Sequence, residues 1–160
     1  MHRQEARAFT LAELTIVVLI VAILAAVGLP AISESYSDIS LRSSSQRLML
    51  ELSYARNLAI TDGAKYGLSF STTGYKVVKV TSANLDDEFA AITSPVTHSP
   101  WNVSFAAERI TLAASFAGHA IIWFDSTGAP NTSGSVVLTR TGRSLTVSVE
   151  ALTGRTTVAQ

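Results

Sequence analysis

The hydrophobic residues of this chain form one continuous run near the N-terminus. Between residues 14 and 29 every position is apolar except one threonine and one glycine. Sixteen helical residues span only about 24 Å, whereas the hydrocarbon core of a bilayer is about 30 Å thick. Extending the segment back to Phe9 and forward to Ile32 makes it long enough, because leucine, isoleucine, valine and alanine fill most of it. The run therefore predicts a helix that spans a membrane.

The charges on either side of this run predict its orientation. Arg3 and Arg7 precede it, whereas Glu34 and Asp38 follow it before any basic residue. Basic flanks remain in the cytoplasm, so we expect the N-terminus inside and the bulk of the chain exported. A cleaved secretory signal is an alternative, since small residues near the end of the run would suit its cleavage. Against it, Glu13 places a carboxylate at the start of the run, where a charge in lipid is costly.

Beyond the continuous run the pattern becomes that of an amphipathic helix. Pro30 lacks a backbone N–H and should kink the helix. Small and apolar residues then recur at alternating steps of four and three, which places them on one face. They are Leu41, Ser45, Leu48, Leu52, Ala55 and Ala59, whereas Arg42, Arg47, Glu51 and Arg56 fall off that face. Gly63 is a suitable C-terminal stop. We expect one helix over residues 9–62, about 80 Å long, with two separate helices as the alternative.

The remaining residues carry the signals of β-strands. We expect strands over residues 66–70, 75–81, 103–105, 110–114, 120–124, 135–140 and 144–150, with a final short strand after Gly154. Residues 82–102 contain three consecutive acids and two prolines, so we interpret them as a long loop. No alternation of strands with helices occurs. The predicted fold class is therefore α+β, with an antiparallel sheet packed on the helix.

Composition and charge argue against a catalytic protein. Lysine plus arginine number 12, as do aspartate plus glutamate, so the net charge suggests no polyanionic partner. The absence of cysteine excludes disulfides, thiolate metal sites and thiol catalysis. Asp125 and His119 are interpreted as a strand-end ion pair or a solvated pair, and residues 86–88 lack the further oxygen ligands of a calcium site. With no hydrolase or phosphate-binding motif, we expect no enzyme, no cofactor and no metal.

Glu13 requires a partner of opposite charge. No lysine or arginine lies within the apolar run, so another chain is the simplest source of that partner. The segment Ala-Phe-Thr-Leu-Ala-Glu at residues 8–13 resembles the cleavage signal of type IV pilins and pseudopilins. The family usually has glycine before the cut, where this chain has Ala8, and both residues are small.

That resemblance implies roles for four residues. Prepilin peptidase would cut between Ala8 and Phe9, and Phe9 would become the N-methylated first residue of the mature chain. The Phe9 amine freed by cleavage would neutralise Glu13 of a neighbouring subunit, which makes Glu13 the assembly contact. Pro30 would stand at the position where the family bends its helix.

Segments of the second half extend the resemblance. Residues 55–60 (ARNLAI), 124–128 (FDSTG) and 153–155 (TGR) are similar to segments of the GspH/FimT family of minor pseudopilins, as are the strands at 135–139 and 145–149. The resemblance implies a type IV pilin-like fold. It divides the chain into a leader at residues 1–8, a transmembrane assembly helix at 9–30, an amphipathic half of the helix at 31–63 and a periplasmic antiparallel β domain at 64–160.

The same resemblance implies a structural function. A minor pseudopilin joins the short periplasmic pseudopilus of type II secretion and supports protein export. The expected partners are prepilin peptidase, other major and minor pseudopilins or pilins, and the inner-membrane assembly platform. The chain is expected first in the inner membrane, as a single-pass protein with its N-terminus in the cytoplasm and its β domain in the periplasm. It is then expected in the pseudopilus.

A FimT-like minor type IV pilin, which serves pilus assembly or DNA uptake, is the alternative. In that group a basic Gly-Arg-x-Arg motif near the C-terminus is implicated in DNA uptake. Here Arg143 and Arg155 each follow a glycine, but the second arginine is absent from both sites. The balanced charge also weakens the electrostatic attraction that DNA binding requires, so a nucleic-acid partner is not expected. A secreted hydrolase is a third class, disfavoured by Glu13 and by the missing catalytic residues.

Overall fold

The computed structural model describes residues 10–81, 89–95 and 98–159, without the side chains of residues 27–35 and Phe89. The chain divides into two compact units, Met1–Ser37 and Asp38–Gln160. Three of the predictions fall outside the described residues. They are the leader at residues 1–8, the cleavage and methylation position at Ala8 and Phe9, and the acidic segment at residues 86–88.

A single helix, α1 (Leu11–Asp62), accounts for 52 residues of the chain. The Thr10 hydroxyl oxygen accepts a hydrogen bond from the Glu13 backbone N–H at 3.2 Å and so caps the first turn. The helix stops before Gly63, whose φ of 63° is the left-handed conformation of a C-terminal cap. The prediction of one continuous helix is therefore confirmed over the described residues, and the alternative of two separate helices is wrong.

Nine strands follow the helix in the described part of the chain. They are β1 (Lys65–Ser71), β2 (Gly74–Val80), β3 (Phe89–Ala91), β4 (Asn102–Ser104), β5 (Thr111–Ser115), β6 (Ile121–Phe124), β7 (Gly134–Arg140), β8 (Arg143–Val149) and β9 (Thr156–Ala159). Eight of them coincide with the expected strands to within one or two residues. β3 is the exception, because it lies inside the segment predicted to be a long loop. The sequence around β3 is typical of a loop, because acidic residues precede it and prolines follow it. The three residues of β3 nevertheless pair with the end of β2.

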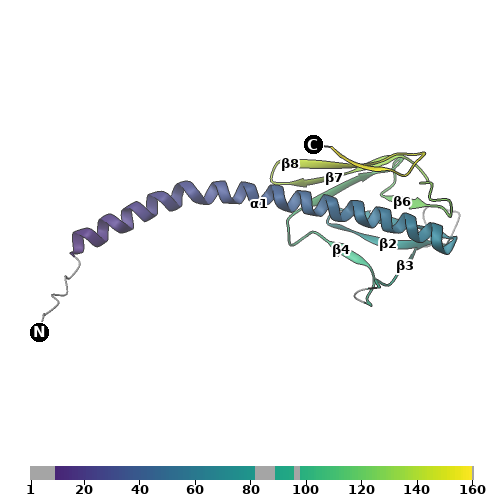
Figure 1. Ribbon diagram of the computed structural model, residues 1–160, viewed down its shortest axis with the longest axis horizontal. Coiled ribbons are helices and arrows are strands. Elements are labelled where there is room, and N and C mark those ends of the chain that lie inside the picture. Colours follow the sequence, from purple (N-terminus) through teal and green to yellow (C-terminus); the bar gives the residue numbers. More distant parts are fainter. Residues whose placement is uncertain (1–9, 82–88, 96–97, 160) are drawn as a thin grey trace, which may run out of the picture. The chain divides into compact units, whose positions relative to one another are not determined.

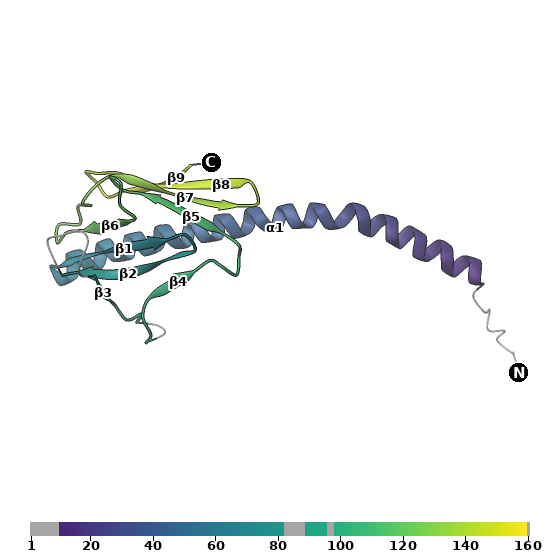
Figure 2. The same ribbon diagram turned by 180° about the vertical axis from the view of Figure 1, so that it is seen from behind.

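The strands form two antiparallel sheets, whereas the sequence pattern predicted one. The first has the order β3-β2-β1-β6, with β4 also paired to β2, and the second has the order β5-β7-β8-β9. Figures 1 and 2 show both sheets lying against the same half of α1, from the front and from behind. The sheets approach each other where the Leu112 N–H donates to the Thr72 carbonyl at 2.9 Å. The choice of strand partners is a long-range property, so alternation within each strand did not reveal the division.

One hydrophobic core joins α1 to both sheets. The predicted face of the helix is buried throughout: Leu41 and Ser45 are 2 % exposed, and Leu48, Leu52, Ala55 and Ala59 are fully buried. Leu68 and Ile122 reach the core from the first sheet, and Leu138 and Val147 reach it from the second. The helix face that the spacing predicted is therefore the surface on which both sheets are assembled.

Two polar side chains enter this core beside the helix face. Glu51, expected off the buried face, is only 9 % exposed, and its carboxylate accepts a hydrogen bond from Arg47 Nε at 3.3 Å. The Tyr75 side chain from β2 is 2 % exposed. Its burial, together with the nearby Glu51 carboxylate, raises the pKa of Tyr75 above its ordinary value. Glu51 is buried because a sheet covers the flank of α1 as well as its central stripe.

We expect Leu52→Ala to destabilise the fold and Leu50→Ala to leave it nearly unchanged. The two leucines lie two positions apart on α1, but Leu52 is fully buried and Leu50 is 70 % exposed. Removal of a buried leucine side chain costs about 2–5 kcal/mol, whereas an exposed substitution costs less than about 0.5 kcal/mol. Urea unfolding of the purified chain, followed by tryptophan fluorescence, measures both. Equal losses for the two variants would contradict the assignment of the core face.

Candidate assembly site

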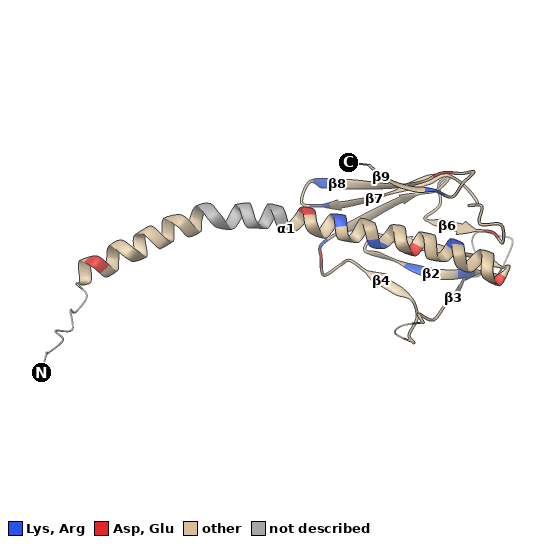
Figure 3. Cartoon of the chain, in the orientation of Figure 1, with Lys and Arg blue, Asp and Glu red and all other residues tan. Residues whose placement is uncertain are grey.

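The N-terminal part of α1 presents a long apolar surface that carries one charge. The large side chains between Leu11 and Leu24 are all about half exposed or more, from 49 % for Val17 to 80 % for Leu11. Glu13 is the one ionisable residue at positions 10–26, and Figure 3 shows the first part of the helix as uncharged apart from acidic colouring near its start. Among the described residues, no helix combines the length and the apolar character needed to cross a membrane.

Glu13 is positioned by the first turn of the helix. It lies three residues after the capping residue Thr10, where a carboxylate is favoured by the unpaired N–H groups and by the positive end of the helix dipole. Its side chain is exposed, and no ion pair to it occurs within the described part of the chain. The helix terminus thus holds an anion in place while leaving it available to a cation from outside.

Pro30 lies inside α1, because the helix continues through it to Asp62. The kink at Pro30 remains a prediction, as does the role of Ala8 and Phe9 in cleavage.

Arg143, one of the two candidate DNA contacts, forms an ion pair within the compact unit Asp38–Gln160, which we call the β unit. It begins β8 after a turn in which Thr141 and Gly142 both have positive φ, 49° and 78°. Its guanidinium forms an ion pair with the Asp38 carboxylate. The pair lines a cavity of about 270 Å³ together with Leu41, Arg42, Ser144 and Leu145. The charge of Arg143 is therefore largely compensated, and its visible role is to attach the β7–β8 turn to α1.

Arg155, the other candidate, stands in an exposed loop before β9. Its backbone N–H donates to the Thr153 hydroxyl at 3.1 Å, and its carbonyl accepts from the Glu150 N–H at 3.0 Å. No ion pair to its side chain occurs among the described residues. The structure does not bring Arg143 and Arg155 into contact with each other.

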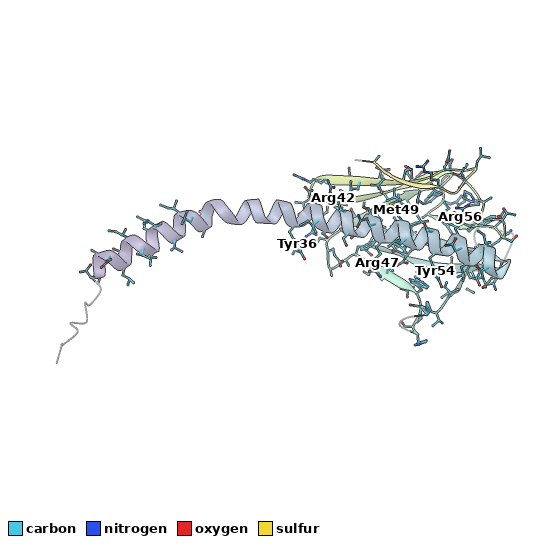
Figure 4. All side chains as sticks on the ribbon, in the orientation of Figure 1. Tyr36, Arg42, Arg47, Met49, Tyr54 and Arg56 are labelled. Carbon is cyan, nitrogen blue, oxygen red and sulfur yellow. The ribbon has the colours of Figure 1, made fainter. Side chains whose placement is uncertain are left out.

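Residues 55–60, 124–128 and 153–155, which resemble segments of the GspH/FimT family, meet at one junction. Arg56 on α1 donates from Nε to the Gly128 carbonyl at 2.9 Å, across 72 positions of sequence. A side-chain carbon at Gly154 would lie 3.2 Å from the Gly128 carbonyl and 3.4 Å from Arg56 Nε. Figure 4 shows Arg56 on the same side of α1 as Arg42 and Met49, opposite Tyr54. Arg56 thus bonds the helix to the loop that follows β6, and Gly154 in the loop after β8 packs beside that bond.

The loop after β6 is organised by Asp125. Its Oδ1 accepts from the Thr127 hydroxyl at 2.6 Å, from the Thr127 N–H at 2.8 Å and from the Ala129 N–H at 3.1 Å. The bond from the Thr127 hydroxyl, supported by backbone N–H groups, holds the pKa of Asp125 below its ordinary value of 3.8. Asp125 therefore shapes the loop that delivers Gly128 to Arg56.

Asp125 and His119 do not form a strand-end ion pair among the described residues. His119 precedes β6 and Asp125 follows it, so the strand Ile121–Phe124 separates them. His119 instead closes a turn in which its backbone N–H and C=O are both bonded to Phe116 at 3.0 Å. In the described part of the chain, no three histidine or acidic side chains gather as metal ligands.

The fold defines the class of protein. A long N-terminal helix whose second half packs on antiparallel sheets is the architecture of type IV pilin-like proteins. A family model, type II transport protein GspH, matches residues 44–153, and the chain belongs to this family. No curated protein sequence matches the chain.

Solved structures share the fold at low sequence identity. The minor pseudopilin EpsH of the type 2 secretion system of Vibrio cholerae superposes with a TM-score of 0.59 at 13 % identity, over 75 % of this chain and 96 % of EpsH. The type IV minor pilin FimU of Pseudomonas aeruginosa superposes with a TM-score of 0.52 at 16 % identity, over 75 % of this chain and 93 % of FimU. Both the pseudopilin and the pilin branch of the class therefore share this architecture.

Sequence reasoning missed the internal partners of two arginines. The carbonyl that accepts from Arg56 lies beyond six strands, and Asp38 lies far from Arg143 in sequence. The similarity of residues 55–60, 124–128 and 153–155 to one family was a signal that they act together, but it did not indicate contact.

We expect Gly128→Ala to cost more stability than Gly142→Ala. Both glycines have a φ near 80°, so both variants incur the strain of a left-handed alanine, about 1–2 kcal/mol. An added carbon at Gly128 would also lie 2.7 Å from Ile60 Cδ1 and 3.0 Å from Arg56 Nε, whereas Gly142 has no atom within 4 Å. Urea unfolding should show an additional loss of about 1–3 kcal/mol for Gly128→Ala. Equal losses would show that the junction accommodates the methyl group.

We expect wild-type stability to fall more steeply in acid than that of Asp125→Asn. The folded-state pKa of Asp125 is lowered, so its contribution is complete above the unfolded pKa and is lost as the pH falls through the folded value. Asparagine keeps an acceptor oxygen but does not titrate. Urea midpoints measured from about pH 7 to about pH 2 test this, with Thr127→Val as a variant that removes the hydroxyl donor. Parallel curves for wild type and Asp125→Asn would contradict it.

Proposed function

We propose that this chain is a minor pseudopilin of a type II secretion pseudopilus, which it joins through its N-terminal helix. The observation that carries the proposal is the exposed apolar surface of α1 with Glu13 as its one charge, in a chain that belongs to the GspH family. Such a surface is unfavourable in water and requires a lipid or protein environment. Pseudopilins are structural proteins that assemble with other pseudopilins, and we propose no enzymatic activity.

Assembly begins with removal of the leader at residues 1–8 by prepilin peptidase. Cleavage between Ala8 and Phe9 creates an amine at Phe9, which is then N-methylated. In a neighbouring subunit, Glu13 accepts this amine as its counter-ion, because a charge left unpaired among apolar side chains is costly. Since Glu13 lies at a fixed point of α1, the same contact sets the axial register of one helix against the next.

The chain is first anchored in the inner membrane by the apolar run. Its N-terminus is cytoplasmic, and its β unit is periplasmic. Pro30 bends the helix between these regions. The inner-membrane assembly platform then transfers the subunit into the periplasmic pseudopilus, where the β unit contacts other major and minor pseudopilins and supports protein export.

A minor type IV pilin is the second candidate, because the FimU superposition shows that pilins share this architecture. The two candidates use the same helix and differ in the fibre that they join. We do not extend the proposal to DNA uptake. The Asp38 carboxylate compensates Arg143, and Arg155 alone provides little of the charge that DNA binding requires.

We expect Glu13→Gln and Glu13→Leu to be cleaved normally but to enter the fibre poorly. Both remove the counter-ion of the Phe9 amine, and loss of one partner of a buried ion pair costs about 3–5 kcal/mol, or at least about a hundredfold in incorporation. Incorporation is measured in isolated fibres against co-expressed wild type. Glu150→Gln, at an exposed acid of the β unit, is the matched control.

Mass spectrometry of each mature chain checks that processing is unchanged. The expected product begins at N-methyl-Phe9 in wild type and in all three variants. Incorporation of Glu13→Leu at the wild-type level would refute the pairing, whereas a mature N-terminus near Leu29 would refute the pilin-like reading altogether.

A further inference from the structure

The last strand, β9, leaves one edge of its sheet open. The opposite edge of that sheet, at β5, is covered by the β1–β2 turn. There the Leu112 backbone N–H donates a hydrogen bond to the Thr72 carbonyl. In the first sheet the edge at β6 is covered by Asn131. The Asn131 side-chain oxygen accepts a hydrogen bond from the Trp123 backbone N–H at 3.0 Å, and the Asn131 backbone N–H donates to the Trp123 carbonyl at 2.9 Å. In the described part of the chain, β9 pairs with β8 alone.

The ladder with β8 determines which backbone groups of β9 face outward. The Glu150 N–H donates to the Arg155 carbonyl at 3.0 Å, so Arg155 directs its C=O toward the β8 side. In an antiparallel pair this direction alternates along the strand. Thr157 and Ala159 therefore also face β8, whereas the N–H and C=O groups of Thr156 and Val158 point away from the sheet. β9 contains no charge and no proline, the usual features that protect an edge strand.

A groove runs beside this edge, between β9 and α1. Thr156 and Val158 stand opposite the buried Val149 and Val147, so their side chains face the helix. A hollow of about 350 Å³ is lined by Gln46, Met49, Leu50, Ser53 and Thr156. A second hollow of about 490 Å³ shares Gln46 and Met49 and includes Val158 and Arg42. The groove is mainly apolar, and Leu50 on its rim is 70 % exposed.

We propose that the open edge of β9 binds an extended segment of a neighbouring pilin-class subunit as a fifth strand of this sheet. The segment carries apolar side chains at alternate positions, which enter the groove over Met49 and Leu50, and an acidic residue at the end beside Arg42. This inference rests on the proposed function, because it takes the partner from the same fibre.

The chemistry of the edge selects this occupant. A helix has no free backbone groups to satisfy the outward N–H and C=O of Val158, whereas an extended chain does. Antiparallel pairing with a second β9 is excluded. Antiparallel pairing of two identical edges about a two-fold axis would direct the two α1 helices in opposite senses, but subunits that leave one membrane must run in the same sense.

The first test removes the Val158 backbone N–H, which is an outward-facing hydrogen-bond donor of β9. In Val158→Pro the lost N–H is one that β8 does not use, and proline is tolerated on the solvent side of an edge strand. Val158→Thr, which keeps the N–H, is the matched control. The mature full chain in mild detergent is titrated with each of the other purified pilin-class subunits of the same cell. We expect Val158→Pro to weaken the tightest interaction about tenfold and Val158→Thr less than about twofold.

The second test is amide hydrogen exchange of the wild-type chain with and without that subunit. Strand addition should slow exchange at Thr156 and Val158 at least about tenfold, because these amides gain partners. If Val158→Pro lowers the melting temperature, Thr156→Lys replaces it as the test variant. Thr156→Lys leaves the backbone intact and places a charge in the groove, so it should weaken binding in the same way.

The outcomes separate this inference from the proposed function. A complex that forms with protection confined to α1, or that binds Val158→Pro and Thr156→Lys as tightly as wild type, overturns the strand addition and leaves the pseudopilin assignment intact. The absence of a complex with any pilin-class subunit counts against the proposed function and overturns the inference with it.

Discussion

The burial of one face of α1 is the interaction on which the rest of the β unit depends. Leu48, Leu52, Ala55 and Ala59 are fully buried, and they contact side chains from both sheets. An isolated helix gains little stability from its own hydrogen bonds, so most of its stability comes from packing of such a face. The sheets depend on the helix in turn, because no ladder joins them within the described residues.

Directional contacts around this core fix how the loops meet the helix. Arg56 reaches the Gly128 carbonyl, Asp125 shapes the loop that presents that carbonyl, and Asp38 holds Arg143 at the β7–β8 turn. The contacts of Arg56 and Asp38 join α1 to points far along the sequence, whereas those of Asp125 lie within its own loop. The segments that resemble the GspH/FimT family are thus explained by structure: they form the junction between helix and sheets, and no catalytic or ligand-binding group is required to account for them.

The surfaces left exposed are those that an assembling subunit requires. The N-terminal part of α1 is apolar except for Glu13, and the C-terminal strand has an open edge beside an apolar groove. A protein that functioned as an isolated monomer would be expected to cover or charge both surfaces. Their exposure accords with membership of a family whose members assemble with other pilin-like subunits.

The sequence by itself determined the local elements of this protein. The spacing of Leu41 to Ala59 predicted the buried helix face, and Gly63 marked the end of the helix. Alternation and turn signals located eight of the nine strands that the described residues form, because each signal comes from neighbouring residues. Only the tertiary structure decided that the strands form two sheets, that β3 lies in the supposed loop, and that Glu51 is buried. It also decided that Arg143 pairs with Asp38 and Arg56 with Gly128. These features depend on which distant segments come into contact. The packing of the whole chain determines those contacts, and the local periodicity of the sequence does not.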